Sequence, residues 1–383
     1  MSERKAIDYW MYNDLKEEIA RLKSVWENEC NGNDLRELTE KTDKGDCDRN
    51  DFNRYMALLI DASHYQKAID EINEFKEKLP IYMTEYNQLG VCYERLKNYH
   101  EAYECYKIAL GLMISSKEFN DVIISNYVKI IDKVNGLSID DKEFEFLKEL
   151  FNISLCNHFK HEIFTFKRRS HGFKYQPFNI NTIDSLTNQY FYLAEKEQLN
   201  DPIEMPMLDD IGEESLICSN YRICSLTNND NSMLMWSHYA EQHQGIMVEY
   251  WFGGELPNGV GMSKVSYDYA ELRKDNQYIF NQYLLTKNKD WEYEKEVRLF
   301  SHKKSKIYYS DYSYPDINSD EINSVIASIT LGLNFPKDKI QLIKSIIQRL
   351  NINRNSTTPP IELRQALLDP QNQFELIYRS VKY

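Results

Sequence analysis

The front half of this chain takes its fold from one segment, YNQLGVCYERLKNYHEAYECYKIAL, residues 86–110. Apolar residues recur in it at intervals of three and four, which is the spacing of one face of a helix. The small residues Gly90 and Ala102 stand where two paired helices must approach each other. The same pattern occurs 34 residues earlier, at Phe52, Tyr55, Met56, Leu59, Ala68 and Ile72. A repeat of this period predicts consecutive helical hairpins.

This pattern resembles the tetratricopeptide repeat, with units at 49–82 and 83–116, and the resemblance implies a protein or peptide partner. A third copy fails at Gly136, which predicts a degenerate helical pair or a capping helix. Two units cannot bury a core alone, because each covers its apolar face with its neighbour. We therefore expect a helical module over 51–169, in which 118–165 caps the stack near the rear domain. Residues 1–50 are expected to hold an amphipathic helix, from Ile7 to Trp26, and a polar loop.

The character of the sequence changes near Ser170, and residues 170–383 predict a mixed α+β domain. Short β-like runs appear between turns, without the regular strand–helix alternation of a parallel sheet. The expected strands are 191–193, 222–226, 246–252, 265–267, 297–300 and 329–333, and the expected helices are 180–188, 269–285 and 337–350. Neither a Gly-x-Gly-x-x-Gly fingerprint nor a phosphate-binding Gly-Lys-Ser/Thr loop occurs in the sequence.

Charge and targeting patterns argue against several classes of protein. The 383 residues carry a formal charge of −14, whereas broad duplex binding needs a concentrated basic face, so we expect no extensive nucleic-acid contact. The N-terminus shows no apolar signal core, and no stretch has the roughly 18 uninterrupted apolar residues of a membrane helix. The seven cysteines are scattered without a Cys-x-x-Cys pair, which is typical of reduced thiols. We expect a cytoplasmic protein that makes no membrane contact.

Two clusters in the rear domain combine aromatic residues with polar groups suited to chemistry. The first joins Lys174 and Tyr175 to the aromatic run 190–193 and to the loop 199–204, which contains Asn200-Asp201-Pro202. A capped turn is the alternative interpretation of that loop. In the second, Met235-Trp236-Ser237-His238-Tyr239, a helix would place His238 beside an inner aromatic face. A structural histidine is the alternative there.

The third cluster reads WEYEKEVRL, residues 291–299. As a strand it would place four charged residues on one face: Glu292, Glu294, Glu296 and Arg298. Adjacent carboxylates repel each other, so at least one needs a cation, which Arg298 or Lys174 would supply. An exposed edge strand protected by its charges is the alternative.

Together the clusters resemble a bacterial family known as domain of unknown function 2971, from about Phe173 to the C-terminus. The resemblance rests on Lys174-Tyr175, Asn200-Asp201-Pro202-x-Glu204, Met235-Trp236-Ser237-His238-Tyr239 and Trp291-x-Tyr293-Glu294-Lys295-Glu296-x-Arg298. The chain departs from the family pattern at Leu199, where Phe is common, and at Gln176, where Arg is common. The role of the second position is therefore open, and the family itself supplies no reaction.

The order of these parts also resembles an ADP-ribosyltransferase, and this resemblance implies NAD as cofactor. In that chemistry nicotinamide leaves a ribose through an oxocarbenium-like state that a carboxylate stabilises. The resemblance implies Glu296 for this carboxylate, Glu294 for positioning the acceptor, and His238 nearby. The residues implied to bind the cofactor are Lys174, Tyr175, Tyr192, Asn200, Asp201 and Arg298, with Tyr192 stacking on nicotinamide.

The function expected from these resemblances is an NAD-using effector, regulated or targeted by the helical module, in bacterial defence or toxicity. Three alternatives stay open. One is a non-enzymatic module that recognises a nucleotide or a protein through the same pocket. Another is a hydrolase or nuclease holding a divalent cation with oxygen ligands from Asp201, Glu204, Glu294 and Glu296. The third is a purely structural adaptor.

Overall fold

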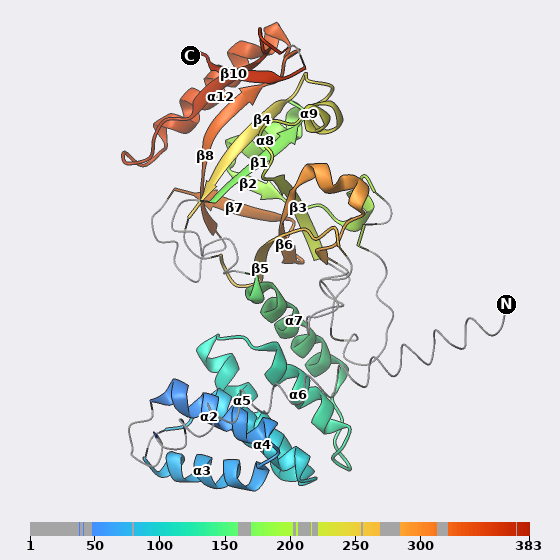
Figure 1. The fold of residues 1–383 in the computed structure, drawn as a ribbon, viewed down its shortest axis with the longest axis vertical. Coiled ribbons are helices and arrows are strands. Elements are labelled where there is room, and N and C mark those ends of the chain that lie inside the picture. Colours follow the sequence, from blue (N-terminus) through green and yellow to red (C-terminus); the bar gives the residue numbers. More distant parts are fainter. Residues whose placement is uncertain are drawn as a thin grey trace, which may run out of the picture. The chain divides into compact units, whose positions relative to one another are not determined.

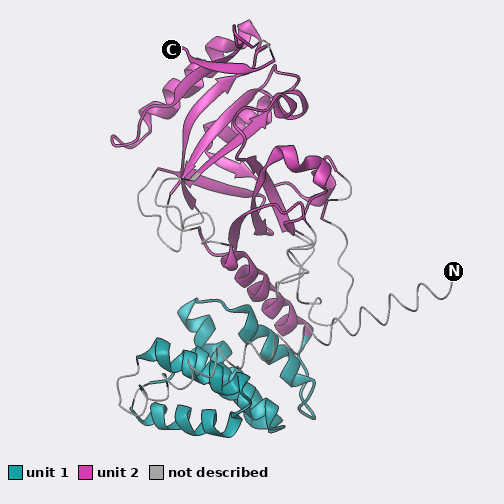
Figure 2. Ribbon diagram, in the orientation of Figure 1, with its two compact units in different colours: residues 1–140 teal, residues 141–383 magenta. Residues whose placement is uncertain are grey.

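The computed structural model describes residues 38, 41, 48–78, 80–159, 170–201, 204–205, 216, 221–253, 256–268, 284–311, 321–372 and 374–383. The chain divides into two compact units, residues 1–140 and 141–383 (Figure 2). Helices form the first, and a mixed sheet with helices forms the second (Figure 1). The two-part, α+β organisation is thereby confirmed, whereas an ADP-ribosyltransferase-like fold stays a prediction. The helix expected from Ile7 to Trp26 and most of the one expected over 269–285 lie outside the described residues.

Successive helices of the first unit pack in the order of the chain. They are α2 (Arg49–Asp61), α3 (Tyr65–Lys78), α4 (Met83–Arg95), α5 (Tyr99–Ser116) and α6 (Asp121–Ile131). Asp48 begins α2 by accepting a hydrogen bond from the Asp51 amide, and Asn120 begins α6 in the same way, which satisfies N–H groups that a helix start leaves unpaired. Helices α2 and α3 form one hairpin and α4 and α5 the next (Figure 1).

A close helix contact of the first unit lies at Gly90, one of the predicted pair of small residues. A side-chain carbon added at Gly90 would overlap the ring of Tyr106. Ala102 and Tyr106 are completely buried, and the Tyr106 hydroxyl donates to Glu94 at 2.8 Å. The close approach predicted at Gly90 is therefore confirmed, and Ala102 is buried in the same helix pair.

Helix α6 continues the stack as expected of a third, incomplete copy. Asn126 donates to the side chain of Asn87 on α4 at 3.0 Å, and Lys133, just after α6, pairs with Glu94 at 2.6 Å. The next helix, α7 (Asp141–His158), differs from our expectation, because it belongs to the second unit and not to the helical module. Its buried residues pack on strands of that unit, β5 and β6.

The second unit is built on one mixed sheet. Its strands are β1 (Ser170–Gln176), β2 (Tyr190–Tyr192), β3 (Tyr221–Thr227), β4 (Ile246–Phe252), β5 (Val260–Lys264), β6 (Glu296–His302), β7 (Lys306–Ser310), β8 (Glu321–Leu331), β9 (Glu362–Leu368) and β10 (Leu376–Ser380). The main order is β10-β9-β8-β4-β1-β3-β6-β5, and β2 joins through β7, which pairs with β8. Pairs β7–β8 and β8–β9 are parallel and the others antiparallel.

Most expected strands are present, and one is not. The run 246–252 coincides with β4, and 297–300 lies within β6. In contrast, the strand expected at 265–267 is absent; Ser266 forms only an isolated bridge with Thr286. The helix expected at 180–188 is α8 (Ile180–Thr187), and the one at 337–350 is a 3-10 turn followed by α12 (Ile340–Ile352).

The two faces of the sheet differ in what covers them. One face packs Val248 and Tyr250 against α8 and α12, and we call it the α8 face. The other packs Phe173 and Tyr175 against α9 (Met233–Tyr239), and we call it the α9 face. Because neighbouring residues of a strand point to opposite sides, β1 alternates between the two faces.

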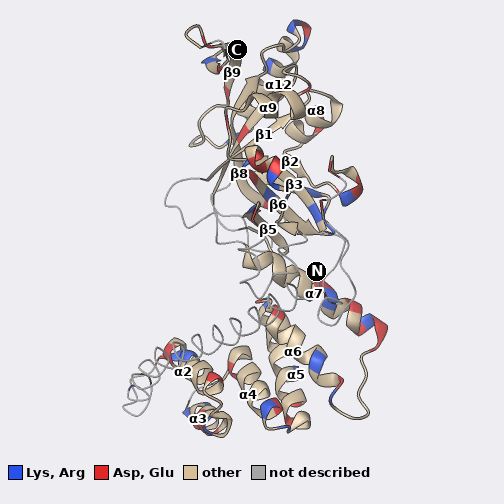
Figure 3. Ribbon diagram, turned by 45° about the vertical axis from the view of Figure 1, so that its right-hand side comes forward, with Lys and Arg blue, Asp and Glu red and all other residues tan. Residues whose placement is uncertain are grey.

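No helix of the described residues is long and apolar enough to span a bilayer. Acidic and basic residues are interspersed along the described helices and strands (Figure 3).

Candidate functional site

Five charged side chains meet at the start of β6, on the α9 face. They are Glu204, Lys287, Glu294, Glu296 and Arg298, all buried, and we call them the ionic cluster. The Lys287 ammonium lies 2.6 Å from Glu204, 2.7 Å from Glu294 and 3.3 Å from Glu296. Arg298 binds Glu296 at 2.8 Å and Glu204 at 3.2 Å. Every carboxylate of the cluster therefore has a cationic partner.

A tight turn, and not a strand, brings Glu294 and Glu296 together. Residues 289–294 form a 3-10 turn, and Lys295 follows with a left-handed φ of 45° before β6 begins at Glu296. Our prediction of a strand over 291–299 was therefore wrong for its first half. Glu292, expected on the same face, is instead exposed.

Within the cluster, charges of opposite sign offset the effect of burial on the pKa of Glu296 and of Lys287. Burial opposes ionisation of Glu296, but Arg298 and Lys287 outweigh it and lower its pKa to about 2. Burial likewise opposes the charge of Lys287, yet Glu296 and Glu204 raise its pKa. At Glu204 burial prevails and raises the pKa. The hydroxyl of Tyr239 donates to Glu294, and burial followed by Glu294 raises the pKa of this tyrosine.

These charges predict acid sensitivity of the second unit. The pKa of Glu296 is lowered from 4.5 to about 2, so its contribution to stability is complete above pH 4.5 and is lost as the pH falls through about 2. We expect Glu296→Gln, which cannot ionise, to show a shallower loss of unfolding free energy over this window than wild type. Urea unfolding at a series of pH values measures both slopes. Glu292→Gln, an exposed neighbour, should keep the wild-type slope, and equal slopes for all three proteins would contradict the prediction.

The cluster is arranged differently from a divalent-metal site. The ammonium of Lys287 occupies the space among the three carboxylates that a metal ion would need. Asp201, the fourth residue of the metal hypothesis, accepts a hydrogen bond from the Trp291 indole at 3.0 Å. Within the described ranges, no group of three or more His, Cys, Asp or Glu side chains is placed to hold a metal ion.

Three other predicted residues lie outside the ionic cluster. His238 is exposed at the end of α9, where its Nδ1 lies 3.0 Å from the Tyr293 hydroxyl. Tyr175 is buried against Trp236, with ring centroids 5.1 Å apart, and donates to the Asn229 carbonyl. Asn200 is exposed in the loop after β2.

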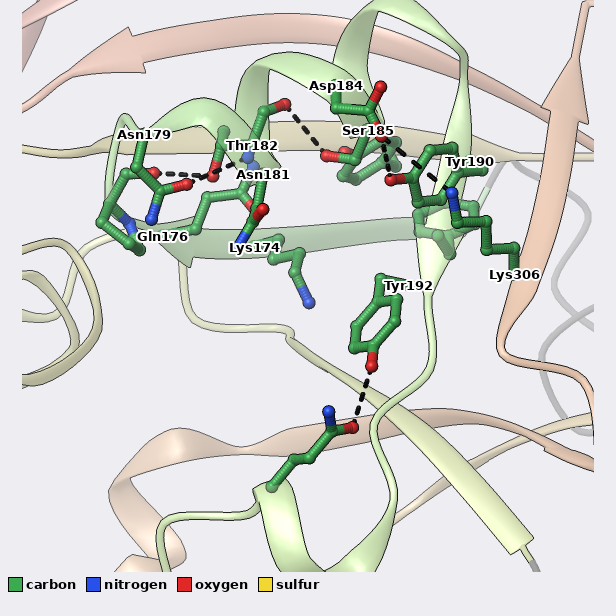
Figure 4. Close-up of a pocket in the computed structure, with 14 residues that line it drawn as sticks. Lys174, Gln176, Asn179, Asn181, Thr182, Asp184, Ser185, Tyr190, Tyr192 and Lys306 are labelled. Atoms are coloured by element: carbon green, nitrogen blue, oxygen red, sulfur yellow. Dashed lines mark hydrogen bonds and ion pairs between the residues drawn. The ribbon is translucent and has the colours of Figure 1, made fainter.

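A cavity of about 570 Å³ lies on the α8 face. It is lined by Lys174 and Gln176 of β1, the first turn of α8, Tyr190 and Tyr192 of β2, Gln198 and Lys306. We call it the α8 cavity. Figure 4 shows Lys174 and Tyr192 directed into the same open space. Of the residues implied to bind NAD, these two therefore come together.

Gln176 is the most informative residue of the α8 cavity. Its side chain is 8 % exposed, and its amide nitrogen is buried without a hydrogen-bond partner. Lys174 places its ammonium 3.1 Å from the Cys224 sulfur, and no carboxylate of the described residues pairs with it. Lys306, in contrast, lies 4.0 Å from Asp184 and 4.1 Å from the Tyr190 ring centre. The lining of the cavity thus includes a cation that no described carboxylate neutralises and a residue whose buried amide nitrogen lacks a hydrogen-bond partner.

The α8 cavity and the ionic cluster lie on opposite faces of the sheet. Lys174 contacts Cys224, whereas the next residue of β3, Ser225, is paired with Arg298. Since adjacent strand residues point to opposite sides, Lys174 and Tyr192 are separated from Glu294, Glu296 and Arg298. The structure does not assemble the implied catalytic and cofactor-binding residues into one pocket.

Sequence reasoning missed Gln176, Lys306 and Lys287. Gln176 carried a signal, since it replaces a residue common in the resembling family. Lys287, the centre of the ionic cluster, carried none, because the neighbouring Thr286 and Asn288 form no motif with it.

No family model, no curated protein and no solved structure matches the chain. The resemblance to domain of unknown function 2971 remains a sequence-based prediction.

Proposed function

We propose that the chain is a ligand-recognition protein. Its second unit binds a small anionic molecule in the α8 cavity, and its helical unit docks a protein partner. The observation that carries this proposal is the buried, unpartnered amide of Gln176 at the cavity wall. Buried polar groups in folded proteins are nearly always hydrogen-bonded, so a ligand oxygen that the amide reaches by rotation of the Gln176 side chain would supply the missing acceptor.

The size of the cavity supports the proposal. Small-molecule sites typically enclose about 300–1,000 Å³, and the α8 cavity measures about 570 Å³. The aromatic residues Tyr190 and Tyr192 of β2 are part of its lining. The unneutralised ammonium of Lys174 favours a negatively charged ligand.

Binding fits this geometry better than ADP-ribosyl transfer. Transfer needs a free carboxylate at the ribose, whereas Glu296 is held by Arg298 and Lys287 on the opposite face. Among the described residues that line the cavity, Asp184 is the only carboxylate. It accepts a hydrogen bond from Tyr190 at 2.6 Å (Figure 4) and another from Asn188 at 2.6 Å.

The proposal is tested by ligand binding to the full chain. Isothermal titration and thermal stabilisation would be measured with NAD, nucleotides, sugar phosphates and dicarboxylates. At least one of these anions should bind wild type, and Gln176→Met should weaken the binding, while the exposed-site control Lys303→Met should not. Absence of binding by every anion would overturn the proposal. Release of nicotinamide from NAD by wild type would instead reinstate the transferase interpretation.

The same substitution predicts an unusual change in stability. An unsatisfied buried donor destabilises the folded state, so Gln176→Met, which keeps the shape and removes the donor, should raise the unfolding free energy of the ligand-free protein by about 1 kcal/mol. Urea unfolding without ligand measures this. A destabilisation by the same amount would show that Gln176 is a structural residue of the folded unit.

A further inference from the structure

The α8 cavity has a donor-rich end and an acid-bearing end. Figure 4 shows Gln176 on the side of Asn179 and Thr182, at the start of α8, and Asp184, Tyr190 and Lys306 on the other side, with Lys174 between the two groups. The first turn of a helix presents N–H groups without intrahelical partners and a partial positive charge. Asn179 takes up one of them by accepting from the Thr182 amide at 3.1 Å.

The opposite end is less suited to an anion. Asp184 lies there with Tyr190 and Lys306, and the cation of Lys306 is already shared between the Asp184 carboxylate and the Tyr190 ring. A bound anion would meet the negative charge of Asp184 at that end, whereas Asp184, the one carboxylate of the described lining, makes its ion pair with Lys306 and not with Lys174. The charge distribution therefore orients an anionic ligand, with its anion toward the start of α8.

An aromatic surface faces the same space. The side chain of Tyr192 is directed toward the space that Lys174 enters (Figure 4), and its hydroxyl donates to Gln198 at 2.9 Å, which holds the ring in place. Tyr192 is 41 % exposed although it is a large aromatic residue. Such a ring is a stacking platform for a planar heterocycle.

We infer that the ligand of the α8 cavity is a nucleotide, with its phosphate between Lys174, Gln176 and the first turn of α8 and its base on Tyr192. This inference rests on the proposed function and names its ligand class. The tetrahedral phosphate accepts hydrogen bonds from several directions, as the ammonium, the amide and the helix N-terminus require. The Gln176 amide, which has no partner in the protein, would then donate a hydrogen bond to a phosphate oxygen.

The test compares ligands that share one part of a nucleotide. The full chain is titrated with the four ribonucleoside monophosphates, the matching nucleosides, inorganic phosphate and succinate. At least one monophosphate should bind more tightly than its nucleoside. Lys174→Met should lower the affinity for this monophosphate at least about tenfold, the cost of one charge-assisted hydrogen bond. Lys306→Met should lower the same affinity less.

A second variant separates the base from the phosphate. Tyr192→Leu should lower the affinity for the monophosphate and leave any binding of inorganic phosphate unchanged. Equal affinity of nucleoside and nucleotide, or a monophosphate affinity unaffected by Lys174→Met, would overturn the inference. Binding of succinate but of no monophosphate would also overturn the inference and leave the proposed function standing. If no ligand binds, both the inference and the proposed function are wrong.

Discussion

Arg298→Met is expected to lower the unfolding free energy of the second unit by about 3–5 kcal/mol, the cost of leaving a buried charge without its partner. Arg298 is fully buried. It makes two contacts with Glu296, one with Glu204 and one with the Leu284 carbonyl at 2.6 Å. Methionine fills much of the same space but leaves three carboxylates around the single cation of Lys287.

Urea unfolding followed by tryptophan fluorescence measures this change, because three of the five tryptophans, Trp236, Trp251 and Trp291, lie in the second unit. The control is Lys303→Met, which removes an exposed pair with Glu149 at 3.4 Å and should cost less than about 1 kcal/mol. A loss no larger than that of the control would mean that the ionic cluster contributes little to the fold.

A double variant tests whether the loss comes from unpaired charge or from packing. Glu296→Leu together with Arg298→Met removes one charge of each sign, so the remaining charges of the cluster keep the same sum. Replacing both members of a buried pair with apolar residues is often neutral. The double variant should therefore be more stable than Arg298→Met alone; equal stability would assign the loss to packing.

Ala102→Leu is expected to lower the unfolding free energy of the helical unit by about 1–3 kcal/mol, because it overpacks a filled contact. Ala102 and Tyr106 on α5 are completely buried, and the Tyr106 ring already lies against Gly90 of α4. The added side chain must displace the ring or separate the helices.

Thermal unfolding followed by circular dichroism measures this loss, with Glu104→Leu as the control on the same helix. Glu104 is exposed, and leucine is a good helix former, so the control should unfold close to wild type. An unchanged melting temperature for Ala102→Leu would show that the repeat register is misplaced.

Local patterns were sufficient where a structure depends on neighbours in the sequence. The spacing from Tyr86 to Tyr106 predicted two helices and their small contact residues. One short segment contains both the apolar periodicity of a helix and the small residues of a close contact. The strand Ile246–Phe252 was found for the same reason. The turn at 289–295 was missed, because alternating residues such as Trp291 to Glu296 suit a strand as well as a turn that tertiary contacts select.

The candidate site shows where local patterns stop. The sequence by itself determined that Lys174, Tyr192, Glu294 and Glu296 are polar or aromatic residues beside strands. Only the tertiary structure decided that Lys174 and Tyr192 share a cavity while Glu294 and Glu296 surround Lys287 on the other face. The physical reason is register. Shifting a strand pairing by one residue moves every side chain to the opposite face, and the pairing of β1, β3 and β6 joins segments far apart in the chain.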